Sequence, residues 1–158
     1  MKKISTILML AAIAIVFQST VKKGTNSSIP PAGYTGAAGD YCTSCHGSFS
    51  LNSGGGSITA TGLPRFNYAP NQSYSFSINI AHGSSDRSRW GFAVKAINRN
   101  TGSAVGTFSS SNSNAISFNG ELSHLGAVST GPQSSYTYTN LNWTAPATSG
   151  IPIDFYYV

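Results

Sequence analysis

The hydrophobic pattern of this chain alternates with a period of two over much of its length. From Ser73 to Ile80, apolar side chains alternate with polar ones, as in a strand with one buried and one wet face. Other short apolar segments are separated by Asn-, Gly- and Pro-rich turns. They are Ser57–Gly62, Trp90–Asn98, Val105–Ser109, Ala115–Phe118, Tyr136–Trp143 and Ile151–Val158. Beyond the N-terminal run no segment has helical spacing, so the sequence predicts an all-β, antiparallel β-sandwich.

The N-terminal residues have the features of an export signal. Lys2 and Lys3 precede an apolar run from Ile4 to Phe17, which is shorter than the roughly 20 residues that span a bilayer and typical of a secretory signal. We predict a cleaved signal peptide over residues 1–20, with an uncleaved anchor as the alternative. The mature chain then has no integral membrane span and is exported to the periplasm, the cell surface or the extracellular space.

Three parts are expected after the signal. Residues 21–40 form an extended lead-in rich in Gly and Pro, and residues 41–56 hold the two cysteines and end in a glycine-rich hinge. Residues 57–158 carry the strand pattern of the sandwich. Because the apolar pattern runs to Val158 without a turn or a polar tail, we expect the chain to be truncated at its C-terminus.

The composition narrows the function classes. Only 8% of the residues are charged and four are acidic, so paired-carboxylate hydrolysis and carboxylate metal centres are poorly supported. The net charge of +5 is reduced once Lys2 and Lys3 are removed, and the other basic residues are dispersed, which argues against binding to nucleic acid. The sequence also lacks a nucleophile elbow. We therefore expect a protein that is not an enzyme.

The one specific motif is Cys42-Thr43-Ser44-Cys45-His46, which has the spacing of covalent c-type haem attachment. Two thiols three positions apart reach the two vinyl groups on one edge of a porphyrin, and the adjacent imidazole binds the iron. The motif therefore predicts covalently attached haem c, with Cys42 and Cys45 as thioether partners and His46 as an iron ligand. Such haem is attached after export, so the signal and the motif agree.

Other interpretations of the motif stay open. In an oxidising compartment, Cys42 and Cys45 can instead form a short disulfide beside an ordinary His46. A thioredoxin-type dithiol is less favoured because it needs a helix N-terminus in an α/β unit. Zinc would need a fourth ligand from a distant part of the chain.

The sixth iron position has few candidate ligands. Met1 and Met9 both lie in the signal, so methionine ligation within the mature chain is excluded. The remaining choices are His82, His124, water or a group from a partner molecule. A second histidine would give a low-spin centre suited to electron transfer, whereas an open position would bind small ligands.

Several motifs together resemble the bacterial exported Reelin-like (reeler) family, also called the choice-of-anchor V domain. They are Pro31–Asp40 leading into the cysteine motif, Gly62-Leu63-Pro64, Arg89-Trp90-Gly91-Phe92, Ser123-His124 and Trp143-Thr144-Ala145-Pro146. The resemblance runs from Ile29 to the end of the chain and implies an immunoglobulin-like β-sandwich. It also favours His124 as the distal iron ligand, with His82 as the alternative, because Ser123-His124-Leu125 stands where the family has a Thr-His-Thr-like segment.

The sequence thus supports two functions of different classes. The first is an exported c-type haem-binding protein, an electron-transfer or haem-carrying module on a reeler-like β-sandwich, whose redox or surface partner is unknown. The alternative is a non-haem adhesion or interaction module of the cell surface, in which Cys42 and Cys45 form a disulfide. A haem peroxidase ranks third because no distal acid–base pair is identifiable in the sequence.

Overall fold

The computed structural model describes residues 29–48 and 50–158, and the predicted signal peptide lies outside them. Regular structure in the described part consists of one short 3-10 helix, η1 (Cys42–Ser44), and strands. The strands are β1 (Gly56–Thr61), β2 (Ser73–His82), β3 (Arg87–Trp90), β4 (Ala93–Asn98), β5 (Thr107–Ser110), β6 (Ala115–Phe118), β7 (Glu121–His124), β8 (Val128–Gln133), β9 (Ser135–Thr144) and β10 (Ile153–Tyr157).

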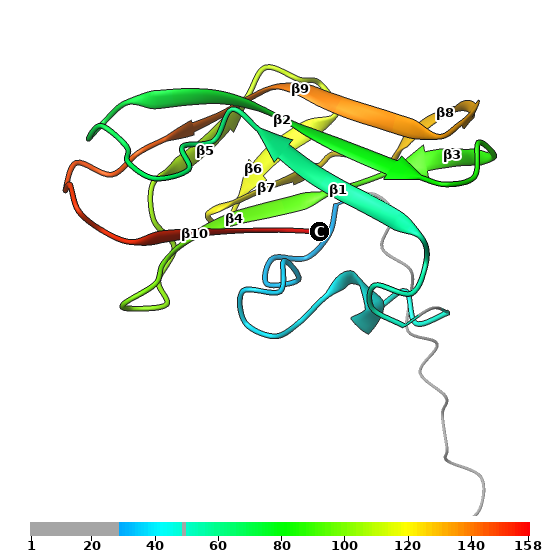
Figure 1. Cartoon of the computed structure of the whole chain (residues 1–158), viewed down its shortest axis with the longest axis horizontal. Coiled ribbons are helices and arrows are strands. Elements are labelled where there is room, and N and C mark those ends of the chain that lie inside the picture. Colours follow the sequence, from blue (N-terminus) through cyan, green and yellow to red (C-terminus); the bar gives the residue numbers. More distant parts are fainter. Residues whose placement is uncertain (1–28, 49) are drawn as a thin grey trace, which may run out of the picture.

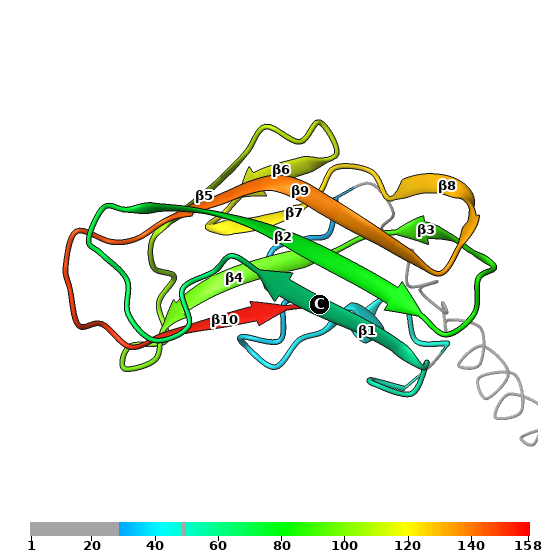
Figure 2. The ribbon, with the colours of Figure 1, turned by 45° about the horizontal axis from the view of Figure 1, so that its top comes forward.

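Two four-stranded sheets form the body of the fold. Their strand orders are β1-β2-β9-β5 and β10-β4-β7-β6, and β3 pairs with β8 in a separate ribbon. All of these pairs are antiparallel. Figures 1 and 2 show the two sheets as layers, with the β3–β8 ribbon at one end. The predicted all-β antiparallel sandwich is confirmed.

Aromatic side chains join the two layers across the core. Tyr138 and Trp143 of β9 are fully buried. The ring of Phe92 lies over Tyr138 with the ring centroids 4.6 Å apart, and Phe155 of β10 meets Trp143 edge-on at 5.0 Å. Aromatic pairs at such spacing contribute about 0.5–1.5 kcal/mol each beyond the area that they bury. The sheets are therefore held together by specific ring contacts as well as by apolar burial.

The strand predicted from alternation, Ser73–Ile80, is part of β2, which extends to His82. Phe76 and Ile78 of its apolar face are buried, whereas Ser73 and Ser75 of its polar face are exposed. β2 lies between β1 and β9 in its sheet. Its last residue, His82, is the register partner of Gly56 at the start of β1. The strand thus ends next to the hinge that follows the cysteine motif.

The segment predicted as one strand, Trp90–Asn98, contains the end of β3 and the whole of β4, which belong to different sheets. The change of sheet takes place at Gly91, where a Cβ atom would lie 2.7 Å from the ring of His124. Only a glycine leaves room for that ring. The apolar run in the sequence is continuous, so it does not reveal the change of sheet.

β3 shares only Trp90 with the predicted strands, and β7 and β8 lie wholly outside them, for different physical reasons. All four residues of β7 are buried, including the polar residues Glu121, Ser123 and His124, so the strand shows no alternation of apolar and polar positions. β8 contains Gly131 and Pro132, two residue types that weaken a strand interior. Both strands are formed because of their neighbours and not because of their own sequence pattern.

The described part of the lead-in, residues 29–40, packs against the second sheet. Lys95 of β4 and Glu121 of β7 are register partners, and Lys95 Nζ donates a hydrogen bond to Glu121 Oε1 at 2.9 Å. The same oxygen accepts the backbone N–H of Gly33 at 2.9 Å. Thr35, two residues further on, is also buried. These contacts hold the chain on the sandwich just before the cysteines, and Figure 1 shows the segment on the β10–β4 side.

The buried hydroxyl of Tyr138 predicts a loss of stability at alkaline pH. It donates a hydrogen bond to the Trp90 carbonyl at 2.8 Å. The pKa of Tyr138 is raised from 10.0 to about 12, and desolvation is the largest cause. The backbone at Val128 opposes this rise, and Tyr136 adds to it. Above the unfolded pKa the unfolded chain loses a proton that the folded chain keeps, so the free energy of unfolding falls as the pH rises from 10 towards 12.

Denaturant unfolding of the wild type and of Tyr138→Phe across this range measures the effect. The variant lacks this part of the pH dependence, and at neutral pH it is less stable by about 1–2 kcal/mol because the Trp90 carbonyl loses its donor. Parallel pH profiles for the two proteins would contradict the assignment to Tyr138.

Candidate functional site

The cysteine motif forms a single helical turn. The backbone N–H groups of Cys45 and His46 both donate to the Cys42 carbonyl, at 3.1 and 2.9 Å, and the N–H of Ser44 donates to the Tyr41 carbonyl at 2.8 Å. In such a turn, side chains three positions apart lie on the same side. The turn therefore directs the side chains of Cys42 and Cys45 to one side of the segment, with His46 directly after them.

Both cysteines are free thiols; Cys42 is exposed and Cys45 is partly exposed. Although Cys42 as a whole is exposed, its sulfur is partly shielded from water, and this desolvation raises the pKa of the Cys42 thiol. The backbone of Cys42 opposes the rise in pKa and the nearby Cys45 adds to it. A redox-active dithiol needs the reverse, a lowered pKa that yields thiolate at neutral pH. The site thus lacks the electrostatics of a thioredoxin-type centre.

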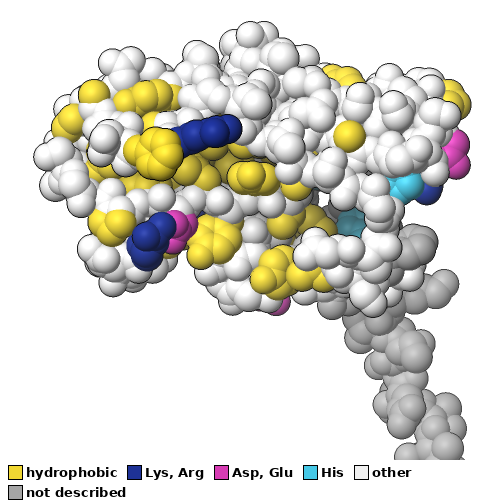
Figure 3. Space-filling view, viewed as in Figure 1, with side chains coloured by type: hydrophobic (Ala, Val, Ile, Leu, Met, Phe, Trp, Pro, Cys, Tyr) yellow, Lys and Arg dark blue, Asp and Glu magenta, His cyan; other side chains and the backbone are white. Residues whose placement is uncertain are grey.

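A hollow of about 470 Å³ lies beside this turn. Cys42 and His46 line it on the side of the motif, and His82 and Arg87 line it on the side of the sandwich. The hinge from residue 50 to residue 56 supplies the rest of its wall. Figure 3 shows histidine side chains gathered at one end of the visible face. The volume is in the range of roughly 300–1,000 Å³ typical of small-molecule and cofactor sites.

His82 connects the end of β2 to the hinge. Its Nε2 lies 2.6 Å from the Gly54 carbonyl oxygen. Its Nδ1 accepts hydrogen bonds from the backbone N–H of Ser84 at 3.0 Å and from Arg87 Nε at 3.3 Å. Because Nδ1 faces two donors, the neutral ring carries its proton on Nε2 and donates it to Gly54. Binding of iron through Nε2 would therefore require this hydrogen bond to be released.

His124 lies in the sandwich and does not line the hollow beside the motif. Its side chain is 8% exposed, and its Nδ1 is 3.0 Å from both the backbone nitrogen and the carbonyl oxygen of Phe92. The imidazole ring packs against Gly91. Of the two histidines predicted as distal ligands, the structure thus brings His82 to the hollow lined by Cys42 and His46. It holds the ring of His124, the last residue of β7, against Gly91 and Phe92 at the β3–β4 junction.

A second hollow, of about 580 Å³, adjoins the first. The two share several lining residues, among them His82 and Arg87. Ile58, Ile80, Arg89 and Trp90 line the second hollow and not the first. The sequence pattern assigns these apolar residues to strands but does not show that they line a common groove, because the groove is formed by the ends of β1 and β2 and by β3. The full set of lining residues shared by the two hollows is Asn52, Gly56, His82 and Arg87.

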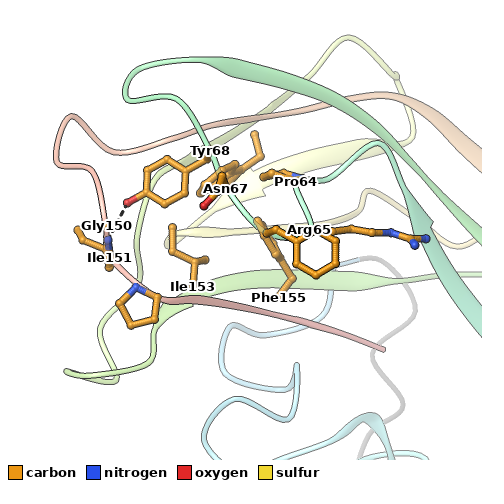
Figure 4. A pocket seen from close by; sticks show the side chains of 11 residues that line it. Pro64, Arg65, Asn67, Tyr68, Gly150, Ile151, Ile153 and Phe155 are labelled. Carbon is orange, nitrogen blue, oxygen red and sulfur yellow. Dashed lines mark hydrogen bonds between the residues drawn. The ribbon is translucent and has the colours of Figure 1, made fainter.

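A third hollow, of about 230 Å³, lies between the loop that precedes β2 and the start of β10. Figure 4 shows Tyr68 beside it, facing Ile151 and Ile153, with Phe155 near the other end. The Tyr68 hydroxyl donates to the Thr148 carbonyl at 2.8 Å and accepts the N–H of Ile151 at 3.2 Å. None of the residues of the cysteine motif lines this hollow, so it is separate from the candidate site.

The described residues contain neither a metal-binding cluster nor a membrane-spanning helix, and the chain matches no protein-family model. Within residues 29–48 and 50–158, no three His, Cys, Asp or Glu side chains are grouped so that they could hold a metal ion. No helix in the described part of the chain is long and apolar enough to cross a membrane. The chain matches no protein-family model and no curated protein. The resemblance to the reeler family rests on the sequence motifs alone.

The packing of His124 against Gly91 predicts a matched pair of glycine variants. In Gly91→Ala the new Cβ would lie 2.7 Å from a ring atom of His124, so we expect a loss of about 1–3 kcal/mol in the free energy of unfolding. In Gly83→Ala the new Cβ meets no atom within 4 Å, so this variant is expected to remain close to wild type. Denaturant unfolding measures both, and equal stability of the two variants would contradict the close packing.

Proposed function

We propose that this protein is an exported c-type haem protein that serves as an electron-transfer or haem-carrying module. Cys42 and Cys45 would form the thioethers, and His46 would bind the iron on the side of the motif. When bound, haem supplies a one-electron redox centre. The observation that supports the proposal is the helical turn that carries both free thiols on one side, beside a hollow lined by two histidines.

The residues at the site fit such a group. The two sulfurs are unbonded, and both cysteines are at least partly exposed, so both are available for thioether formation. The hollow beside them is large enough for a cofactor and borders the sandwich. A tethered group there would stay close to solvent, since Leu51 and Cys42 on its wall are exposed. Exposure of this kind favours electron exchange with another protein over the catalysis of a reaction in a closed pocket.

For the sixth iron position we propose His82, with His124 as the competing ligand. His82 and His46 line the same hollow, whereas the imidazole of His124 packs on Gly91. Ligation of His82 through Nε2 costs the hydrogen bond to Gly54, which a metal–imidazole bond outweighs. The export and the reeler-like character of the sandwich are also part of this proposal and are supported by the sequence motifs.

Covalent attachment is tested by producing the full-length protein in a bacterial host with cytochrome c maturation. The wild type is expected to keep haem through denaturing electrophoresis and to gain the mass of one haem, because thioether bonds survive unfolding. The matched control is Cys42→Ala with Cys45→Ala, which keeps His46 and is expected to lose the haem stain. A colourless wild type with a Cys42–Cys45 disulfide would overturn the proposal and favour the surface adhesion module.

The sixth ligand is tested by spectroscopy of the haem-loaded protein. We expect a low-spin wild type, a high-spin His82→Ala variant and a low-spin His124→Gln variant, because only loss of the ligand opens the iron. The reverse pattern would assign the position to His124. A spectrum that neither substitution alters would exclude both histidines and leave water or a partner group.

A further inference from the structure

The two adjoining hollows form one groove with chemically different ends. Cys42 and His46 line only the first hollow, and Arg89 lines only the second. His82 and Arg87 line both and therefore lie at the junction between them. The groove thus joins a hollow beside the helical turn of the cysteine motif to a hollow lined by Arg89, with His82 and Arg87 between them.

Part of the wall of the second hollow is apolar. Ile58 of β1 and Ile80 of β2 are register partners in the first sheet, and both line the hollow together with Trp90. Trp90 is 4% exposed, and its Nε1–H donates to Thr130 Oγ1 at 3.2 Å. Such a surface suits the flat face of a macrocycle, which gains from apolar and aromatic contact.

The second hollow carries a cation without an ion-pair partner among the described residues. Arg87, Lys95 and Arg99 are each paired with a carboxylate. Among the described residues this leaves two cations without such a pair, Arg65 and Arg89, and only Arg89 lies in the groove. No Asp or Glu lines either hollow of the groove. The second hollow can therefore bind an anion at Arg89, and a guanidinium binds carboxylates in a bidentate manner.

On the basis of the proposed function, we propose that Arg89 binds the propionate carboxylates of the tethered porphyrin and thereby lays the macrocycle along the groove. A porphyrin of this type bears its vinyl groups on one edge and its carboxylates on the opposite edge. The groove has a matching arrangement, with the thiol of Cys42 in the first hollow and the guanidinium of Arg89 in the second. Arg87 lies at the junction of the two hollows and is already paired with Asp86, so it is not the residue proposed to bind the carboxylates. Arg89 is a positioning residue, since it acts on the porphyrin edge and not on the iron.

The first test uses the haem-loaded full chain and compares Arg89→Gln with Arg65→Gln. Both substitutions remove one positive charge that has no ion-pair partner, but Arg65 lines the separate hollow beside Tyr68. Loss of a positive charge beside the porphyrin favours the oxidised state, so the midpoint potential of Arg89→Gln is expected to fall below that of the wild type. The potential of the variant is also expected to depend less on salt concentration than that of the wild type. Arg65→Gln is expected to keep the wild-type potential. Equal potentials for all three proteins would overturn the inference while leaving the haem attachment intact.

The second test does not depend on covalent attachment. In the Cys42→Ala, Cys45→Ala protein, ferric haem is expected to bind about tenfold more tightly than its dimethyl ester, since a guanidinium forms a stronger, charge-assisted pair with a carboxylate than with an ester. Adding Arg89→Gln should remove this preference, and adding Arg65→Gln should keep it. A preference that survives Arg89→Gln would overturn the inference. A colourless wild type that still shows the Arg89-dependent preference would overturn the haem attachment alone.

Discussion

The buried carboxylate of Glu121 is the contact on which the arrangement of the candidate site depends. One of its oxygens accepts a hydrogen bond from Lys95 within the second sheet and another from the backbone of Gly33 in the lead-in. A buried carboxylate that loses either donor is costly, because the remaining charge is poorly solvated. The chain before the cysteine motif is therefore fixed to the sandwich at one definite place. After the motif, the contact between His82 and Gly54 performs the same task.

Between these two contacts the cysteine motif lies against the sandwich and is not enclosed by it. The turn from Cys42 to His46 is held mainly by its own backbone hydrogen bonds, and the sandwich contributes one wall of the hollow through His82 and Arg87. The site is thus assembled from a local element and a distant one. This division explains why the fold can have a conventional core while the chemistry is concentrated in a short segment outside it.

The sequence is informative where the chemistry or the period is local. The alternation around Ser73–Ile80 marks β2, and the cysteine motif, identified from its spacing, forms a single turn held by its own backbone hydrogen bonds. The sequence is uninformative where distant residues decide. β7 is buried on both faces because the lead-in covers it, and the change of sheet at Gly91 depends on the ring of His124. The position of His82 beside the motif depends on the course of the hinge, which no local pattern describes.

The contact of the lead-in with Glu121 has a consequence for how this segment can vary between related sequences. The donor is a main-chain N–H, so no side chain of the lead-in takes part in it. Gly33 has a φ of 101°, a conformation that residues other than glycine adopt only with strain. Natural variation can therefore exchange the side chains around position 33 while the anchoring persists. Only a change of the glycine at position 33 or of the acid at position 121 would weaken this contact.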